Sequence, residues 1–482
     1  MKNKGQNLLA NIVLFAVNGI GSRLGVFLLV PLYAHYMSKS EFGTADLIYS
    51  TVSVLLLVCT LKVPAAVLRF AMNPETDRNE VLGNGLFIVF VSSAATALLT
   101  FIFVTVTGMT PYLYFIPVIY FLASLKEVIA QFSKAVGQVK IFAFDGFVSS
   151  FVLLAASVIF LMQFRTGIFG YLMAIAVSNL VSIIYLAVFA RIPLHFSFSA
   201  YKNRTMREML AFCCPMVPNS ISWRVIAVSD HYMVAGFIGA AANGVYSIAY
   251  KIPSMLGVVA DIFIQAWLLS AIDEYERERD YSKFARIYAC YEALLFLASS
   301  FIIGCNRYLC SFFLGPEFSS AYRYTPFLLI ALLFSNVQAF FAVLYNAAKQ
   351  TRSLMSVTMF GAGVNVALNA LLIPWIGVYG AIIATCASYL LIMVLRIRGA
   401  RKFITFEVDF RLMAANTALL LIQACNDVFN DRYFLLFDIL CFAAFCLLNW
   451  KRIVTLCRDG LEMVKRLLNK HHKDKIITNK ES

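Results

Sequence analysis

The sequence predicts an all-α polytopic membrane protein of about fourteen transmembrane helices, with two six-helix parallel-repeat lobes and two extra C-terminal helices. Its composition is the first reason: 61% of the 482 residues are hydrophobic, 14% are charged, and the mean hydropathy is +0.78. Ordinary soluble domains are far less apolar. The second reason is a series of long apolar runs, each near the ~20 residues that cross ~30 Å of hydrocarbon. The third is the distribution of positive charge between these runs.

The apolar runs set the expected order of helices. Several contain proline, which bends a membrane helix and is tolerated where neighbours or cavity water satisfy the freed carbonyl. After the last run, apolar and basic side chains share residues 451–468 at helical spacing, a pattern typical of a helix on the inner membrane face. The expected spans are residues 8–36, 44–68, 83–107, 112–131, 141–163, 167–190, 209–237, 244–270, 285–304, 324–346, 353–373, 377–396, 410–429 and 432–450.

Positive charge between the spans predicts the topology. Of the 40 Lys and Arg, 31 belong to the amino terminus, alternate loops, the carboxyl tail or the span ends beside them, and only five to the opposite loops or the span ends beside those. Because cytoplasmic loops carry the excess of Lys and Arg, both termini are expected in the cytoplasm. The net charge of +14 is spread over these short loops and the tail, which favours contact with anionic lipid over nucleic acid.

A weak internal repeat predicts the lobes. Arg23 and Gly43, in the first two spans, are separated by 20 residues, and Arg224 and Gly244 repeat that spacing in the seventh and eighth spans. A longer match aligns the sixth span with the twelfth. Units six spans apart enter the membrane from the same side, so the repeats are parallel. The expected parts are an N-lobe at 1–200, a C-lobe at 201–402, two extra spans at 403–450 and a basic amphipathic or disordered cytoplasmic tail at 451–482.

Four basic residues lie well inside spans, away from the span ends, and form the candidate substrate site. A charge at membrane depth is costly unless it faces a cavity or a partner, so each is a functional hypothesis. Arginine stays charged and matches phosphate oxygens two at a time, which favours an anion site in a cavity between the lobes. Alternatively, each arginine pairs with a carboxylate for packing, for instance Arg224 with Asp230 or Asp261. The candidate anion-binding residues are Arg23, Arg224, Lys62 and Lys251.

Carboxylates at depth are candidates for ion coupling. In a coupled transporter such groups carry protons or bind Na⁺, and Asp261, Asp230 and Asp46 are the candidates here. The sequence contains none of the motifs GxxxxGK[ST], HExxH or GxSxG, and its cysteines show no metal-ligand spacing. The loops are also too short for a soluble catalytic domain. We therefore expect a transporter rather than an enzyme, with no cofactor and no metal.

Three segments carry a family resemblance. Residues 38–50, SKSEFGTADLIYS, resemble the first outer loop and second span of polysaccharide-biosynthesis flippases, the Wzx-type oligosaccharide repeat-unit translocases. These proteins belong to the multidrug/oligosaccharidyl-lipid/polysaccharide (MOP) exporter superfamily. Residues 206–252 are more similar still, and residues 314–321, LGPEFSSA, resemble the loop before the tenth span. The resemblance extends over essentially the whole chain.

This resemblance implies a function, a substrate and a location. The family moves undecaprenyl-pyrophosphate-linked oligosaccharide repeat units from the inner to the outer leaflet of the bacterial cytoplasmic membrane. It implies alternating access around a cationic central cavity, to which the four candidate basic residues map. The expected partners are the polyprenyl-linked substrate and membrane lipids, with H⁺ or Na⁺ coupling and glycan-assembly proteins as further candidates. The alternatives are a cation-coupled multidrug exporter of the same superfamily and, less favoured, an integral-membrane glycan polymerase or ligase.

Overall fold

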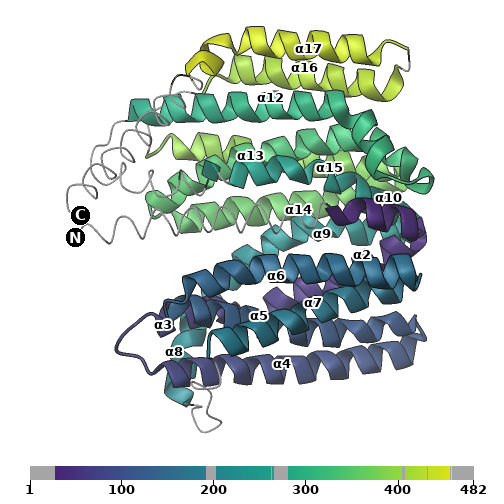
Figure 1. Cartoon of the computed structure of the whole chain (residues 1–482). Coiled ribbons are helices and arrows are strands. Elements are labelled where there is room, and N and C mark those ends of the chain that lie inside the picture. The colour runs from purple at the N-terminus through teal and green to yellow at the C-terminus, as the bar shows by residue number, and fades with distance from the viewer. Residues whose placement is uncertain are drawn as a thin grey trace, which may run out of the picture. The chain divides into compact units, whose positions relative to one another are not determined.

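The computed structural model describes residues 28–191, 202–261, 263–264, 267, 281–403, 408–430, 432–455 and 458, and every regular element in them is helical (Figure 1). This confirms the predicted all-α class. The chain divides into two compact units, which are described in turn. Unit 1 comprises Met1–Ile252, Leu309–Tyr324 and Met355–Ser388, and unit 2 comprises Pro253–Tyr308, Thr325–Leu354 and Tyr389–Ser482. The predicted division into repeat lobes stays a prediction.

The helices follow the predicted order. Several predicted spans agree closely with the structure, and the thirteenth, 410–429, coincides with α16. The elements up to residue 251 are α2 (Lys39–Cys59), α3 (Val63–Ala71), α4 (Arg78–Thr107), η1 (Pro111–Tyr114), α5 (Phe115–Ala135), α6 (Val139–Ser157), η2 (Val158–Gln163), α7 (Gly167–Phe189), α8 (Asn203–Cys213), η5 (Cys214–Met216), α9 (Val217–Phe237) and α10 (Ala240–Lys251). The later ones are α12 (Tyr281–Phe313), η6 (Pro316–Arg323), α13 (Thr325–Ala347), α14 (Thr351–Ile376), α15 (Val378–Ala400), α16 (Phe410–Phe429) and α17 (Phe434–Leu448).

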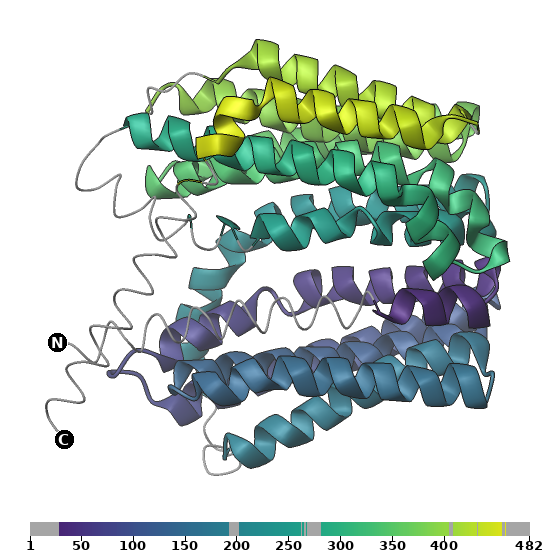
Figure 2. The same cartoon turned by 45° about the horizontal axis from the view of Figure 1, so that its top comes forward.

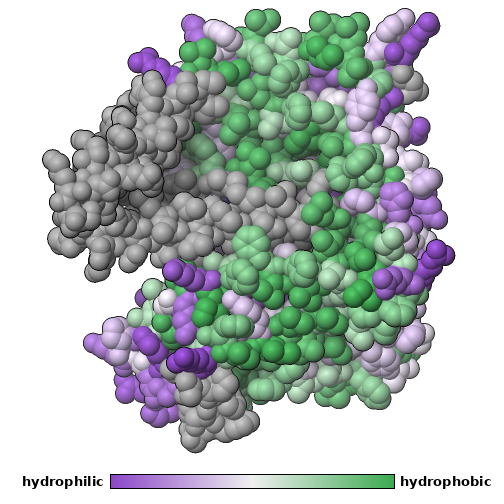
Figure 3. All heavy atoms as spheres, viewed as in Figure 1, coloured by the Kyte–Doolittle hydropathy of each residue, from purple (hydrophilic) through white to green (hydrophobic). Residues whose placement is uncertain are grey.

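Ten helices within the described residues are long and apolar enough to cross a membrane. Their outward faces are apolar: on α4, Leu99 is 66% exposed and Val106 is 78% exposed. Figure 3 shows hydrophobic side chains over the middle of the helices α4 to α7, with hydrophilic ones gathered near the helix ends. An apolar exposed belt between polar ends is what a hydrocarbon environment requires.

The predicted span 44–68 is two helices rather than one. α2 ends at Cys59, α3 begins at Val63, and between them Leu61 and Lys62 adopt left-handed backbone conformations, with φ of 50° and 61°. The proline at position 64 lies in the first turn of α3, where its missing N–H costs no helical hydrogen bond. Hydropathy alone could not place this break because the apolar run continues through it.

The predicted span 209–237 is also interrupted. A short 3-10 segment, η5, joins the amphipathic α8 to α9, and it contains Pro215. The ring removes a donor and clashes with the preceding turn, so a regular α-helix cannot continue. On α8 the buried side chains include Met206 and Met209, while Arg204 is exposed. The helix therefore lies with one apolar face against α3 and α4.

Two glycines bring α2 and α10 into close contact in unit 1. A Cβ added to Gly43 would overlap the carbonyl oxygen of Ala240, and one added to Gly244 would overlap the carbonyl oxygen of Lys39. Small residues let membrane helices approach to backbone contact. Asn243 Nδ2 also donates to the Gly43 carbonyl at 3.0 Å. Since one helix comes from each predicted lobe, this contact joins the two halves of the predicted repeat.

Candidate functional site

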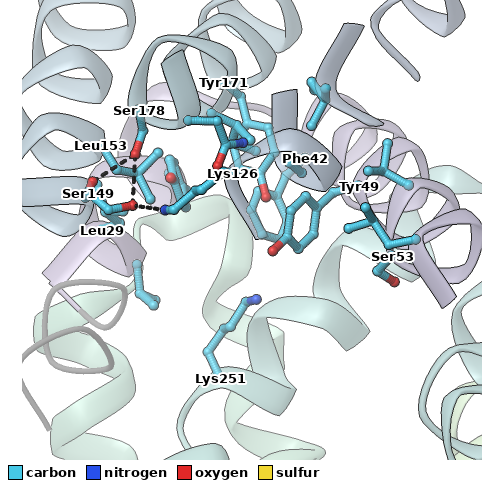
Figure 4. Close-up of a pocket in the computed structure, with 18 of the residues that line it drawn as sticks. Leu29, Phe42, Tyr49, Ser53, Lys126, Ser149, Leu153, Tyr171, Ser178 and Lys251 are labelled. Carbon is cyan, nitrogen blue, oxygen red and sulfur yellow. Dashed lines mark hydrogen bonds between the residues drawn. The ribbon is translucent and has the colours of Figure 1, made fainter. Parts of the chain in front are cut away.

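Unit 1 encloses a cavity of about 270 Å³ between residues of α2, α5, α6, α7 and α10 (Figure 4). Its wall combines aromatic, hydroxyl and basic side chains, and none of the described residues that line it is acidic. Lysine and hydroxyl side chains that line a cavity within a membrane protein are suited to an anionic or hydroxyl-rich ligand. The polar and aromatic lining residues are Tyr33, Phe42, Tyr49, Ser53, Lys126, Ser149, Tyr171, Ser178, Asn179 and Lys251.

Lys126 of α5 is the best-defined basic group of the cavity. Its Nζ donates to Ser149 Oγ at 2.6 Å and lies 4.0 Å from Asp145 Oδ2. Ser178 Oγ donates to the Ser149 carbonyl at 2.7 Å, and Ser182 donates to Asp145. Figure 4 shows the ammonium group directed toward the serine pair at the cavity wall. Helices α5, α6 and α7 together hold the ammonium group at the wall.

Lys251, a predicted site residue, is the second ammonium group of this cavity. It is the last residue of α10, and Figure 4 shows it reaching into the pocket from another helix than Lys126. Its charge interacts with Asp46 of α2. The prediction that Lys251 faces a cavity therefore agrees with its position, while its role in binding stays a prediction.

Aromatic rings form part of the cavity wall. Tyr33 and Tyr171 meet edge-on with centroids 4.9 Å apart, and Phe42 lies 5.8 Å from Tyr33 and 6.0 Å from Tyr171. Beside them, the side chain of Tyr49 is 46% exposed. Aromatic rings that carry hydroxyl groups offer both a flat apolar face and a hydrogen-bonding edge.

The two carboxylates predicted for ion coupling in this unit are engaged in buried hydrogen-bond networks. Asp46 Oδ2 accepts from Ser247 Oγ at 2.8 Å and lies 3.0 Å from His231 Nδ1. His231 Nδ1 is also 2.9 Å from Ser247 Oγ and 3.2 Å from Asn243 Oδ1. These contacts tie α2, α9 and α10 together around a polar centre.

Asp230, the neighbour of His231 on α9, has a separate set of partners. Its carboxylate accepts from Tyr246 OH at 2.9 Å and from Asn369 Nδ2 and Thr385 Oγ1. Asn369 Oδ1 is buried without a hydrogen-bond partner among the described residues. The alternative pairing of Arg224 with Asp230 does not occur in the described residues, because amide and hydroxyl groups satisfy this carboxylate.

The other predicted site residues are distributed differently. Arg23 lies outside the described residues, and Asp261 belongs to unit 2. Arg224 and Lys62 both interact electrostatically with Glu127 of α5. Within the part of the chain that is described, neither basic residue forms a hydrogen bond or an ion pair. The structure therefore brings Lys62, Arg224 and a previously unassigned carboxylate toward one another.

Sequence analysis assigned no role to Lys126 or Glu127. Both lie near the inner end of the predicted span 112–131, where charges are ordinarily interfacial. α5 continues to Ala135, so this adjacent acid–base pair is two turns inside the helix. The available signal was a Lys-Glu pair followed by further apolar and small residues that prolong the helix.

The sequence and fold both match known membrane proteins. A family model described as polysaccharide biosynthesis protein matches residues 8–268. The structure is similar to the lipid II flippase MurJ in an inward closed conformation, with a TM-score of 0.70, 13% identity, and coverage of 92% of this chain and 100% of MurJ. A comparison with curated proteins finds no match.

Two other solved structures share the fold. One is a multidrug resistance MATE family transporter of the MOP superfamily in an inward-facing conformation, with a TM-score of 0.63, 11% identity, and coverage of 80% of this chain and 94% of that one. The other is a MOP superfamily transporter from Pyrococcus furiosus, with a TM-score of 0.56, 13% identity, and coverage of 81% and 95%. The chain is thus a multi-pass membrane protein with the fold of MOP-superfamily transporters. More specifically, it belongs to the polysaccharide biosynthesis protein family.

Proposed function

We propose that this protein is a flippase for polyprenyl-pyrophosphate-linked oligosaccharide repeat units in the bacterial cytoplasmic membrane, with both termini in the cytoplasm. The observation that carries the proposal is the cavity in unit 1, because Lys126 and Lys251 line it and, in the part of the chain that is described, no acidic residue does. Two ammonium groups offset part of the desolvation cost of a pyrophosphate. Family membership and the similarity to MurJ support a lipid-linked glycan as the cargo.

The substrate's three parts place different demands on the protein. Pyrophosphate requires positive charge, which the two lysines and Arg224 would supply. The sugars require hydroxyl and aromatic partners, such as Tyr49, Ser149 and Ser178. The polyprenyl chain stays in the bilayer, since extracting it would cost ~0.8 kcal/mol per CH₂.

Energetics favour outward movement of such a cargo. Outward transfer of negative charge across an inside-negative membrane potential releases ~2.3 kcal/mol per elementary charge per 100 mV. The lysines must bind the anion similarly in both states of an alternating-access cycle, because unequal affinity would trap one state. A flexible ammonium group held by serine hydroxyls meets this requirement better than a rigid bidentate clamp.

Ion coupling would use Asp230 within this scheme. Carboxylate, amide and hydroxyl oxygens are suitable ligands for Na⁺. Asp230, Asn369 and Thr385 provide such oxygens from three helices. The buried Asn369 Oδ1 without a partner among the described residues fits a cation better than a closed hydrogen-bond network does. Protonation of the carboxylate is the other means of neutralising the site. Asp46 is a weaker candidate, since His231 already neighbours it.

The decisive experiment measures export in cells that depend on this protein. We expect the single substitutions Lys126→Met and Lys251→Met to leave a complete lipid-linked repeat unit on the inner leaflet, detected by mass spectrometry and an impermeant glycan-modifying reagent. Each change removes a cavity charge while keeping a long side chain. Lys140→Met is the matched control, because Lys140 is exposed in the first turn of α6 and should support normal export.

Two results would count against the proposal. Full export by both cavity variants, at normal membrane abundance, would refute the anion-binding role of these lysines. Absence of lipid-linked glycan accumulation in cells lacking the protein, together with efflux of organic cations by the purified protein, would favour the multidrug-exporter alternative that the MATE-like fold allows. Product formation by the protein alone would instead favour a polymerase or ligase.

A further inference from the structure

Unit 2 contains a second buried polar cluster, in the three-helix group of α12, α16 and α17. Figures 1 and 2 both show these helices side by side. Charged and amide side chains at membrane depth mark functional positions more often than packing alone. The cluster consists of residues no more than 2% exposed, namely Ser300, Asn306, Gln423, Asp427 and Asp438.

Asp427 of α16 has a cation beside it. Asn306 Nδ2 donates to its Oδ2 at 2.6 Å, and Arg307 Nε lies 3.3 Å from its Oδ1. The same guanidinium donates to the Asp427 carbonyl at 2.8 Å and stacks over Phe434 at 4.4 Å. Arg307 and Asp427 therefore form an ion pair fixed from several sides.

Asp438 of α17 lacks such compensation. Its Oδ1 lies 3.5 Å from Asn426 Nδ2, and Gln423 also interacts with the carboxylate, but Oδ2 is buried without a hydrogen-bond partner in the described parts of the chain. The Asp427 carboxylate repels the Asp438 carboxylate, and Arg307, which is paired with Asp427, attracts it. The thiols of Cys305 and Cys441 also lie near Asp438. Two carboxylates with one guanidinium leave one negative charge, which is costly in a buried site.

We propose that Asp438 is a proton-binding site of the folded protein, with the proton on Oδ2. A proton neutralises the carboxylate without a coordination shell. A metal ion is less suited, because the described residues contain no group of three or more His, Cys, Asp or Glu that could hold one. Gln423 Oε1 and the Ser300 carbonyl oxygen already accept hydrogen bonds from Ser300 and Gln423. They therefore offer no free oxygen ligands to a metal ion.

The site lies near one end of its helix pair. Asp438 is the fifth residue of α17, and Asp427 lies in the last turn of α16. Both are near the connection at 430–433, which the predicted topology places on the outer side. Loss of the proton would put two like charges between α16 and α17, which weakens their packing.

The test is thermal unfolding of the purified full chain in detergent between about pH 5 and about pH 9, where ordinary carboxylates stay ionised. A proton held in the folded state and lost on unfolding stabilises at low pH, and the stability disappears as the pH rises. We expect the folded-to-unfolded ratio of the wild type to fall by up to about tenfold per pH unit across this titration. Asp438→Asn, which mimics the protonated acid, should lack this step and match the low-pH wild type.

A matched variant and a chemical probe complete the test. Asp427→Asn should be destabilised at every pH, because it leaves Arg307 uncompensated, yet it should retain a pH step. In the wild type, dicyclohexylcarbodiimide adds across the protonated acid to give an acylurea at Asp438, and this labelling should decline as the pH rises. Equal pH dependence in wild type and Asp438→Asn, or absence of labelling at low pH, would overturn the proposal. Na⁺ binding at Asp438 would also overturn the proposal. It would appear as a shift of the wild-type unfolding midpoint when Na⁺ replaces choline at constant pH, with no such shift in Asp438→Asn.

Discussion

Replacing Gly244 with alanine tests whether contact between α2 and α10 supports the cavity. The new methyl group would overlap the carbonyl of Lys39, and a backbone atom cannot turn aside as a flexible side chain can. Overpacking of this kind costs ~1–3 kcal/mol, and the upper end applies because a whole helix must move. At ~2 °C per kcal/mol, the midpoint of thermal unfolding should fall by about 6 °C.

The same displacement should reduce export, since α2 carries Tyr49 and α10 carries Lys251 on the cavity wall. Scanning fluorimetry of the purified protein and export of the lipid-linked repeat unit measure the two effects. Gly363→Ala is the matched control, because a Cβ there meets nothing within 4 Å, and helix propensity predicts a gain of up to ~1 kcal/mol. Equal unfolding midpoints for Gly244→Ala and wild type would refute the close-packing argument.

Two further substitutions test buried charges. Arg452→Met should destabilise unit 2 by ~3–5 kcal/mol, because it leaves the fully buried Glu292, 2.6 Å from Arg452, without its cation. Adding Glu292→Leu should restore most of the lost free energy of unfolding, measured by chemical denaturation. Asp230→Asn should abolish any dependence of transport in proteoliposomes on a Na⁺ or H⁺ gradient while leaving substrate binding measurable. Gradient-dependent transport that persists in this variant would remove Asp230 from the coupling mechanism.

Hydropathy and charge predicted the helices better than their interruptions. The thirteenth span matched α16 at both ends because a polar aspartate caps its first turn and Asn430 follows its last. The break at Leu61 and Lys62 was not predicted, since leucine and lysine favour helices and only their tertiary surroundings hold them at positive φ. Sequence periodicity reports which residues avoid water, and it does not report where two apolar helices diverge.

The candidate site was predicted only in part, for a related reason. Lys251 was found because it stands alone inside a long apolar run. Lys126 was overlooked because it lies next to Glu127 near the inner end of a predicted span, where paired charges are normally solvated. Its role depends on Ser149 and Ser178, which come from two other helices. Such a grouping is a property of the packed bundle, and spacing along one helix does not encode it.

In unit 1 two lysines line the cavity, while the buried acids Asp46 and Asp230 lie outside its lining. Asp46 and Asp230 are committed to hydroxyl, imidazole and amide partners on neighbouring helices, outside the cavity lining. Lys126 and Lys251 keep their ammonium groups at the wall. Asp46 thereby helps to hold α2, α9 and α10 together, and Asp230 joins α9 to α10, α14 and α15. Neutralising either acid should therefore affect helix packing or ion coupling before it affects anion binding, whereas loss of either lysine should act on the anion directly.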